Sequence, residues 1–274
     1  MVPRSSAHTP APLRPYLLLA PPSQPHSLNL VTSILGTSPS WLVLRAIAEA
    51  LAKDDERHAA EVVLGIPLST ITPPSRLQFV DGVTALFSST SPPAAPLPSP
   101  SSETQPLPPL RTATLAALRA AILPLLSPTK RTLLVLDGLD LLPACTSPAI
   151  PAHEVSALLV ALRSRAHATL VTLSADSALS VPDTPLGANH AAIVALAAHQ
   201  ARWVLQVRGL DTGGARDVGG VIRVGRGGGW DWGEMGGEDG EDGEEGGDDG
   251  EWLFHVGGDG GVKVWRRGEG SGSG

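Results

Sequence analysis

One stretch of the chain, residues 131–140 with the sequence RTLLVLDGLD, constrains the fold more than any other. An apolar run that ends at an aspartate is typical of a buried parallel strand, because helices cover both faces of such a strand. The chemistry of α/β sheets gathers at the carboxyl ends of the strands. The sequence therefore predicts an α/β protein with Asp137 at the functional edge of its sheet.

A nucleotide hydrolase would also need a glycine-rich loop that ends in Gly-Lys-Ser or Gly-Lys-Thr to hold the phosphates. Neither tripeptide occurs in the chain. Residues 36–43 have the strand–loop–helix context of such a loop, but Trp41, Leu42 and Val43 occupy the positions of its second glycine, lysine and hydroxyl residue. We expect Gly36, Ser40 and Asp137 to mark a degenerate nucleotide site, although backbone amides at the helix start leave anion binding open.

The remaining pattern alternates between strands and helices and then changes to strands alone. Apolar spacing predicts strands at 28–35, 61–66, 77–81, 131–137 and 168–173, and helices at 41–53, 112–126, 153–165 and 189–200. Short strands at 202–208 and 220–225 precede a hairpin at 252–265, whose turn is built from Gly257-Gly-Asp-Gly260. This order predicts a three-layer α/β fold with a mostly parallel central sheet and C-terminal antiparallel hairpins.

Several segments have compositions that do not favour a packed core. Glycine and proline together supply 56 of the 274 residues, which points to unfolded portions. We expect a loose Pro-rich N-terminal segment (1–27), in which residues 17–20 can dock, followed by a domain over 28–226 with a disordered Ser/Pro insertion (88–110). A disordered acidic loop (227–251) then leads to a hairpin of the same domain (252–267) and a flexible tail (268–274).

The net charge of −7 is distributed unevenly. Residues 231–251 contain eleven acidic residues and no Lys or Arg, so the rest of the chain carries +4. A mildly basic body of this kind is compatible with nucleic-acid binding but is weak evidence for it, and the acidic loop is interpreted first as a solubilising segment.

Other classes of protein find little support in the sequence. Cys145 is the single cysteine, which excludes a disulfide framework and a thiolate metal cluster, and no apolar run is long enough for a membrane span. We expect a soluble intracellular protein. His167, His190 and His199 are available to a hydrolytic triad, but the nucleophile elbow of hydrolases is absent. The eight histidines show no ligand spacing with acids. Asp137 and Asp140 are either metal ligands or ordinary cap and turn residues, and we expect no metal and no cofactor.

Four arginines gather near the C-terminal strands: Arg208, Arg216, Arg223 and Arg226. They lie beside glycine-rich turns, where guanidinium groups can bind phosphates or a neighbouring subunit through paired hydrogen bonds. A solvated surface is the alternative interpretation, and the sequence does not decide between the two.

Six motifs together resemble the Elongator complex subunit 6 family in its fungal form. They lie at residues 35–45, 136–140, 171–177, 198–201, 210–218 and 255–265. Their order along the chain makes the resemblance more specific than any single motif, and it covers most of the chain outside 1–15, 88–110 and 227–250.

The resemblance implies a RecA-like fold and a place in a ring. In that family the fourth, fifth and sixth subunits alternate in a hetero-hexamer that docks on the catalytic Elongator subunits and binds tRNA, and the assembly modifies wobble uridine (U34) at its 5-position. The family lacks a conventional phosphate loop. Arg226 before Gly227 matches the position of a basic residue that reaches a neighbour's nucleotide, whereas the lysine that some relatives have two residues earlier is Val224 here.

These observations lead to the prediction of a non-catalytic RecA-like subunit of the Elongator complex, without a cofactor, in the cytoplasm and with the nucleus as a second compartment. Two alternatives stay open. One is an ATPase subunit whose site is shared across the ring interface, and the other is a free-standing α/β hydrolase.

Overall fold

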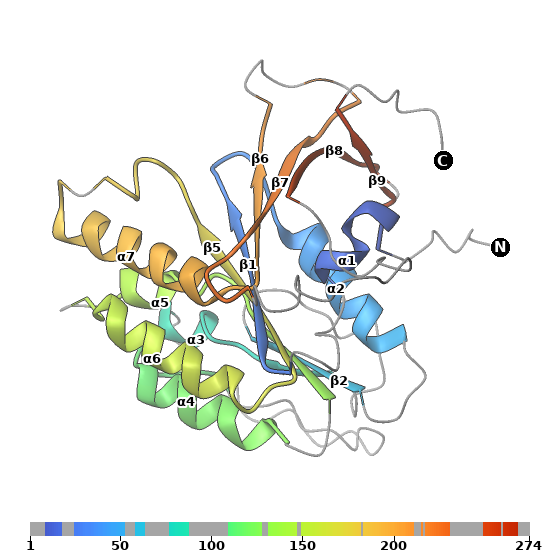
Figure 1. Cartoon of the computed structure of the whole chain (residues 1–274). Coiled ribbons are helices and arrows are strands. Elements are labelled where there is room, and N and C mark those ends of the chain that lie inside the picture. Colours follow the sequence, from blue (N-terminus) through green and yellow to red (C-terminus); the bar gives the residue numbers. More distant parts are fainter. Residues whose placement is uncertain are drawn as a thin grey trace, which may run out of the picture.

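The computed structural model describes residues 9–17, 25–52, 58–63, 77–87, 109–127, 131–146, 149–181, 183–210, 215, 217–230, 249–258 and 260–267. These residues form a twisted sheet with helices on both sides (Figure 1). The predicted α/β fold with a mixed sheet, mostly parallel in its core, is confirmed.

The sheet has nine strands within the described residues, in the order β3-β2-β4-β5-β1-β6-β7-β8-β9. Its parallel part comprises β1 (Ser27–Ser33), β2 (His58–Val63), β3 (Leu77–Val80), β4 (Arg131–Leu136), β5 (Ala168–Ser174) and β6 (Trp203–Arg208). The antiparallel extension adds β7 (Gly220–Arg226), β8 (Gly250–Val256) and β9 (Val262–Arg266) beyond β6. The carboxyl ends of all six parallel strands therefore lie at one edge of the sheet.

Helices form the two outer layers. One side of the sheet packs against α2 (Ser40–Ala52) with the short η1 (Ala11–Leu13) and α1 (Arg14–Leu17). The other side packs against α4 (Leu115–Ile122), η2 (Leu123–Leu125), α6 (Ala152–Arg163) and α7 (Pro185–Gln200). Two single-turn helices, α3 (Thr84–Phe87) and α5 (Leu141–Ala144), follow β3 and β4.

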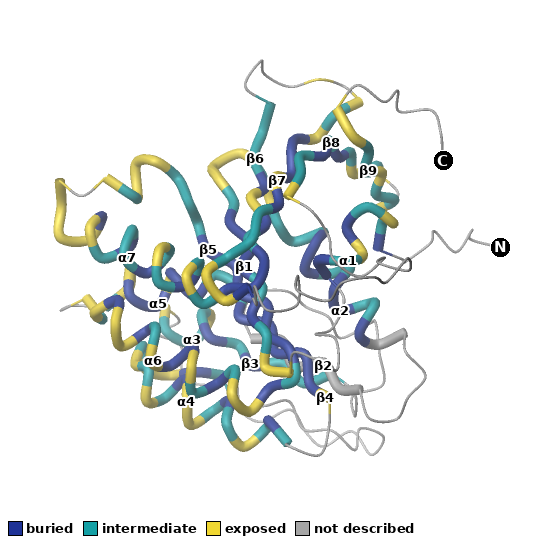
Figure 2. Tube along the Cα trace, viewed as in Figure 1, coloured by how far each residue is buried: buried dark blue, intermediate teal, exposed yellow. Residues whose placement is uncertain are grey.

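The core consists of two apolar clusters, one on each side of the sheet. The central strands of the sheet are largely buried (Figure 2). Strand β1 supplies both, because successive side chains of a strand point to opposite faces: Leu28 and Leu30 pack with the α4–α6–α7 layer, and Val31 packs with α2. This double burial is the reason that the parallel strands are almost continuously apolar.

Helix starts are set by side-chain caps. The Thr184 hydroxyl accepts a hydrogen bond from the Gly187 amide at 3.0 Å, and Pro185 follows at the first helical position, so α7 begins four residues before the predicted start at 189. Thr114 caps α4 in the same way through the Ala117 amide at 3.2 Å. Asp81 holds the start of α3 by accepting from the Val83 and Thr84 amides.

The expectation of a loose N-terminal segment over 1–27 is wrong for residues 9–16, whereas Leu17 is docked as expected. Leu13, Tyr16 and Leu17 are buried in the α2-side cluster, where the Tyr16 ring packs edge-on against Trp203 at 4.9 Å between centroids. The Tyr16 carbonyl also accepts a hydrogen bond from the Asn29 side chain at 2.8 Å. This segment therefore forms part of the layer that covers the sheet.

The prediction of a disordered acidic loop over 227–251 is wrong at both ends of that segment. Residues 227–230 form a turn in which the Gly227 amide donates to the Arg202 carbonyl at 2.8 Å, and Trp230 is buried. Strand β8 already begins at Gly250. Residues 231–248, residues 88–108 of the Ser/Pro insertion and the tail 268–274 lie outside the described residues, whereas Leu110, the last residue of the predicted insertion, is buried.

Candidate functional site

A cleft of about 260 Å³ opens at the carboxyl edge of the sheet. It is bounded by the ends of β1, β4 and β5, where α/β proteins place their ligands. The residues that line it are Ser33, Pro39, Val83, Asp137, Gly138, Asp140, Leu141, Thr172, Leu173 and Ser174. Two carboxylates face this space and none of these lining residues is basic, so the cleft offers no cation to a phosphate group.

Asp137 lies in the cleft at the position predicted from the sequence. The Thr172 hydroxyl donates a hydrogen bond to Asp137 Oδ1 at 2.5 Å and accepts one from the Gly138 amide at 2.7 Å. Burial raises the pKa of Asp137, the hydrogen bond from Thr172 partly offsets this rise, and the neighbouring charge of Asp140 adds to it. Asp137 is thus tied to β5 and is less acidic than an ordinary aspartate.

Asp140 occupies the residue before α5, but its side chain does not cap that helix. Its Oδ2 instead accepts a hydrogen bond from the Ser174 amide at 3.2 Å, and the residue is buried. Both aspartates therefore connect the end of β4 to β5. Among the described residues no group of three or more His, Cys, Asp or Glu side chains is placed to hold a metal ion.

The loop between β1 and α2 has the course of a phosphate loop without its chemistry. Gly36 has φ of +88°, a conformation that favours glycine, and Ser40 begins α2 with its hydroxyl accepting from Ser38 Oγ at 2.8 Å. Leu42 and Val43, at the lysine and hydroxyl positions, are fully buried in the core. Gly36 and Ser40 follow β1 at the same edge of the sheet as Asp137, but of the three only Asp137 is among the residues that line the cleft. The side chains that would hold phosphates are replaced by core residues.

Trp41 explains why this loop cannot approach a ligand as a glycine-rich loop does. Its ring packs against Phe254 of β8 with 5.1 Å between centroids. On the next turn of α2, the Arg45 guanidinium donates to the Gly260 carbonyl in the β8–β9 turn at 2.7 Å. The first turns of α2 are therefore bound to the C-terminal hairpin, a contact that spans more than 200 residues of sequence.

The structure separates the four arginines that the sequence grouped. Leu205 and Val207 of β6 belong to the buried inner face, so Gln206 and Arg208 point to the outer face. Arg223 of β7 is paired with Gln206 and therefore lies on that same outer face. Arg226 belongs to the opposite face, where its guanidinium lies 5.1 Å from the centre of the Trp230 ring, with Arg202 at 5.0 Å from the same ring. Arg216 lies outside the described residues.

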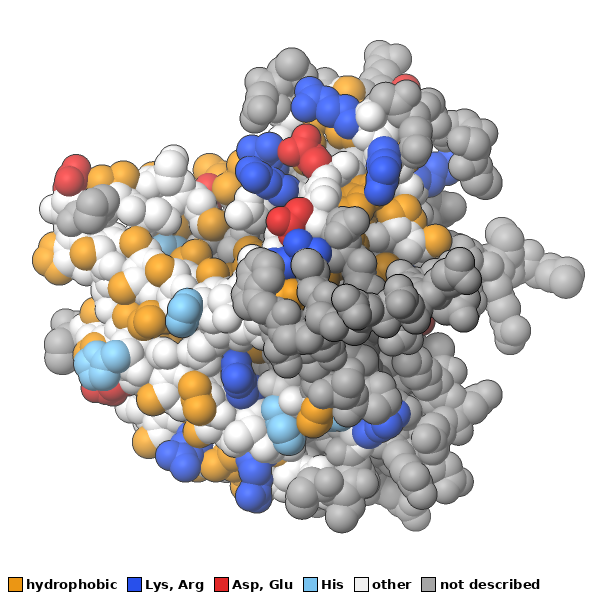
Figure 3. All heavy atoms as spheres, viewed as in Figure 1, with side chains coloured by type: hydrophobic (Ala, Val, Ile, Leu, Met, Phe, Trp, Pro, Cys, Tyr) orange, Lys and Arg blue, Asp and Glu red, His pale blue; other side chains and the backbone are white. Residues whose placement is uncertain are grey.

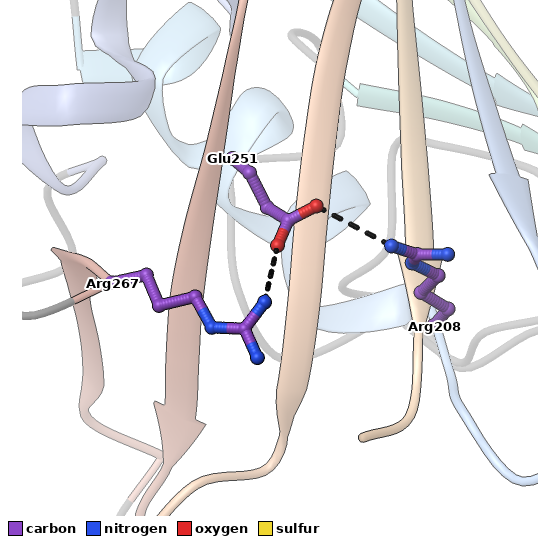
Figure 4. Close-up of polar contacts among 3 residues, drawn as sticks. All are labelled: Arg208, Glu251 and Arg267. Atoms are coloured by element: carbon purple, nitrogen blue, oxygen red, sulfur yellow. Dashed lines mark hydrogen bonds and ion pairs between the residues drawn. The ribbon is translucent and has the colours of Figure 1, made fainter. Parts of the chain in front are cut away.

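One polar cluster on these strands was not predicted from the sequence. Glu251 of β8 pairs with Arg208 of β6 at 3.3 Å and with Arg267, which follows β9, at 3.5 Å (Figure 4). The available signal was the alternation Lys263-Val-Trp265-Arg-Arg267, which places the first, third and fifth side chains on one face of a strand.

The histidines do not assemble a hydrolytic triad in the described part of the chain. His190 forms a 2.8 Å hydrogen bond through Nε2, but its partner is the backbone carbonyl of Ser174 rather than a side-chain nucleophile. His26 similarly contacts the carbonyl of Ala166 at 2.7 Å, at the opposite edge of the sheet from the cleft. Both rings connect backbone segments.

Neither a protein-family model nor a curated protein matches this chain. Every helix in the described ranges falls short of the length and apolar character needed to cross a bilayer.

Proposed function

We propose that the chain is a non-catalytic, RecA-like subunit of an Elongator-type complex that modifies wobble uridine in tRNA. In this proposal it alternates with the fourth and fifth subunits in a hetero-hexameric ring, docks on the catalytic subunits and contacts tRNA. The single observation that carries the non-catalytic part is the complete burial of Leu42 and Val43 where a phosphate loop has its lysine and hydroxyl.

The arrangement of the sheet supports the RecA-like part of the proposal. The resemblance implies a mostly parallel sheet followed by antiparallel C-terminal hairpins, with a degenerate loop after the first strand. Strands β7, β8 and β9 extend the parallel sheet in this manner, and Trp41 joins the degenerate loop to the extension. Arg208 and Arg223 supply positive charge on one face of that extension, which is compatible with tRNA contact.

Ring formation is tested by co-expression with the two related subunits. We expect the three chains to give a defined hexamer in light scattering, because the exposed edges of the isolated chain would be covered by its neighbours. A chain that stays a stable, monodisperse monomer in the presence of both partners would contradict the ring assignment.

Nucleotide chemistry is tested on the isolated chain. We expect no ATP hydrolysis above background, because none of the described residues that line the cleft is a cation that could balance the triphosphate charge. The Asp137→Ala variant should consequently change the thermal stability without changing turnover. Turnover by the isolated chain that this variant abolishes would overturn the non-catalytic assignment.

One observation favours the ATPase alternative. The cleft at the end of β4 is open and still contains Asp137, the residue that helps to hold Mg²⁺ in nucleotide hydrolases. A neighbouring subunit would have to supply the missing cation. This alternative predicts ATP turnover by the assembled ring, none by the separate chains, and loss of the ring's turnover in Asp137→Asn.

A further inference from the structure

The antiparallel extension β6–β9 has two chemically different faces. Its inner face packs on α1 and α2 and is apolar and aromatic, with Trp203, Leu205, Ile222, Val224, Trp252 and Phe254 all buried. Alternate residues of the same strands point away from that core. The outer face carries Arg208, Arg223, Glu251, Lys263, Trp265 and Arg267. Figure 3 shows Lys and Arg side chains over this part of the molecule, with acidic side chains among them.

Trp265 lies within this outer face. It is directly opposite Leu253 of β8, while the next residue on the inner side, Val264, packs against the core cluster. Lys263 and Arg267 are two residues away on either side and therefore flank the indole on the same face of β9. Trp265 is half-buried, whereas Lys263 and Arg267 are exposed. An aromatic surface thus lies between two cations.

The charge of this face is positive after its ion pairs are counted. Glu251 is shared between Arg208 and Arg267, whose side chains are 37% and 79% exposed. Arg223, which is directly opposite Glu251 in the β7–β8 register, and Lys263 are exposed and have no ion pair within the described residues. Asp249, which immediately precedes β8, has the same strand parity as Glu251 and adds a second carboxylate. Among the described residues of this face, four cations against two carboxylates leave an excess of two positive charges across four strands.

We propose that this outer face binds single-stranded nucleic acid, with an unpaired base stacked on Trp265 and phosphates held by Arg223, Lys263 and Arg267. This proposal rests on the tRNA contact proposed above. It assigns that contact to unpaired bases of the RNA rather than to the duplex stem. Base–aromatic stacking combined with a basic surface is the general means by which proteins hold single strands. Four-stranded antiparallel sheets use the same arrangement to stack splayed RNA bases on an open face.

The shape of the face favours a single strand over a duplex. The four strands β6–β9 span about 14 Å, and the described residues of their outer face include no helix or ribbon that could enter a groove. A duplex would engage the cations but would leave the indole without a base to stack on, since its bases are already paired. An acidic protein segment would also engage the cations and would likewise gain little from Trp265.

The test uses the 274-residue chain and a fluorescein-labelled 12-nucleotide oligouridylate, with fluorescence anisotropy measured over a series of salt concentrations. Trp265→Ala should weaken binding about 5- to 150-fold, the equivalent of about 1–3 kcal/mol for one lost stacking contact. Trp265→Phe keeps an aromatic ring and should recover most of that loss. The rescue separates stacking from a change in the fold.

The charge contribution is tested without altering any buried residue. The double variant Arg223→Ala/Lys263→Ala should make the slope of log affinity against log salt less steep by about 1.4, as expected for two lost phosphate contacts to a single strand. Arg165→Ala removes an exposed arginine from the turn after α6 and is the matched control, for which we expect the parent slope. A 12-base-pair RNA duplex should bind more weakly than the single strand and be insensitive to Trp265→Ala.

Three results would overturn the proposal. The first is parental affinity and salt slope in the double variant. The second is equal binding of duplex and single strand, and the third is polyglutamate binding that outcompetes the oligouridylate, which would assign the face to an acidic protein. None of these measurements depends on the fourth and fifth subunits. A failure of ring assembly would therefore reject the proposed function without changing the outcome of the binding test, and the two failures can be told apart.

Discussion

Restoring the missing lysine at the phosphate-loop position should destabilise the protein rather than create a nucleotide site. Leu42 is fully buried between α2 and the sheet, so Leu42→Lys removes its packing and directs an ammonium group toward the core. Loss of the packing of a buried leucine costs about 2–5 kcal/mol even if the lysine tip reaches water. A buried charge without a partner would add to that cost.

The expected outcome is a fall in Tm of about 4–20 °C, since each kcal/mol corresponds to about 2–4 °C in a domain of this size. Urea unfolding followed by circular dichroism gives the same comparison as a free energy of unfolding. Leu35→Lys is the matched control: it is the same substitution seven residues earlier, at a side chain that is 90% exposed, and should change stability by no more than about 0.5 kcal/mol.

The reasoning would be refuted if Leu42→Lys were as stable as Leu35→Lys. It would be refuted more strongly if the variant also bound MgATP in a calorimetric titration, because the loop would then accept a phosphate-binding side chain at a position that the structure assigns to the core.

Three further perturbations address separate features. Burial raises the folded-state pKa of Asp137 above the ordinary value of 3.8, so the native state binds this proton more tightly than the unfolded state, and stability falls as pH rises from the unfolded pKa through the folded pKa. Asp137→Asn should therefore raise Tm at pH 7, and the gain should vanish below about pH 3.8. An equal gain in Tm at all pH values would contradict this prediction. Gly36→Ala should cost about 1–2 kcal/mol in urea unfolding through backbone strain alone, since φ is +88° and no atom lies within 4 Å of the added methyl group. Deleting residues 233–247 removes seven carboxylates and should leave ring assembly intact while tightening nucleic-acid binding at low salt; loss of assembly would show a structural role.

The parallel core was predictable because its signals are local. Continuous apolar runs with turn residues between them identify β1, β4 and β5, and a strand that ends in Asp137 can be placed at the ligand edge without tertiary information. The same reasoning anticipated that Trp41 and Leu42 replace the phosphate-binding residues. It did not reveal that these side chains are core residues, since burial depends on what the fold brings opposite them.

The errors have equally specific causes. Tyr16 was assigned to a loose segment because its partners, Trp203 and Trp252, lie more than 180 residues away. The arginines were grouped by proximity in sequence, although the two-residue period of a strand already places Arg223 and Arg226 on opposite faces. Applying that period to β7 and β9 would have separated them and revealed the alternation around Trp265.

The way β7 and β8 are joined also makes the sheet tolerant of changes in the length of the chain segment between these two strands. The end of β7 and the start of β8 are joined to each other: the Arg226 amide donates to Asp249 Oδ1 at 3.1 Å, and Val224 pairs with Gly250 across the two strands. Closing a loop between fixed ends costs only about 0.6 kcal/mol for each doubling of its length. A fluorescent domain or an affinity tag inserted between residues 231 and 248 should therefore report on the protein without displacing a strand.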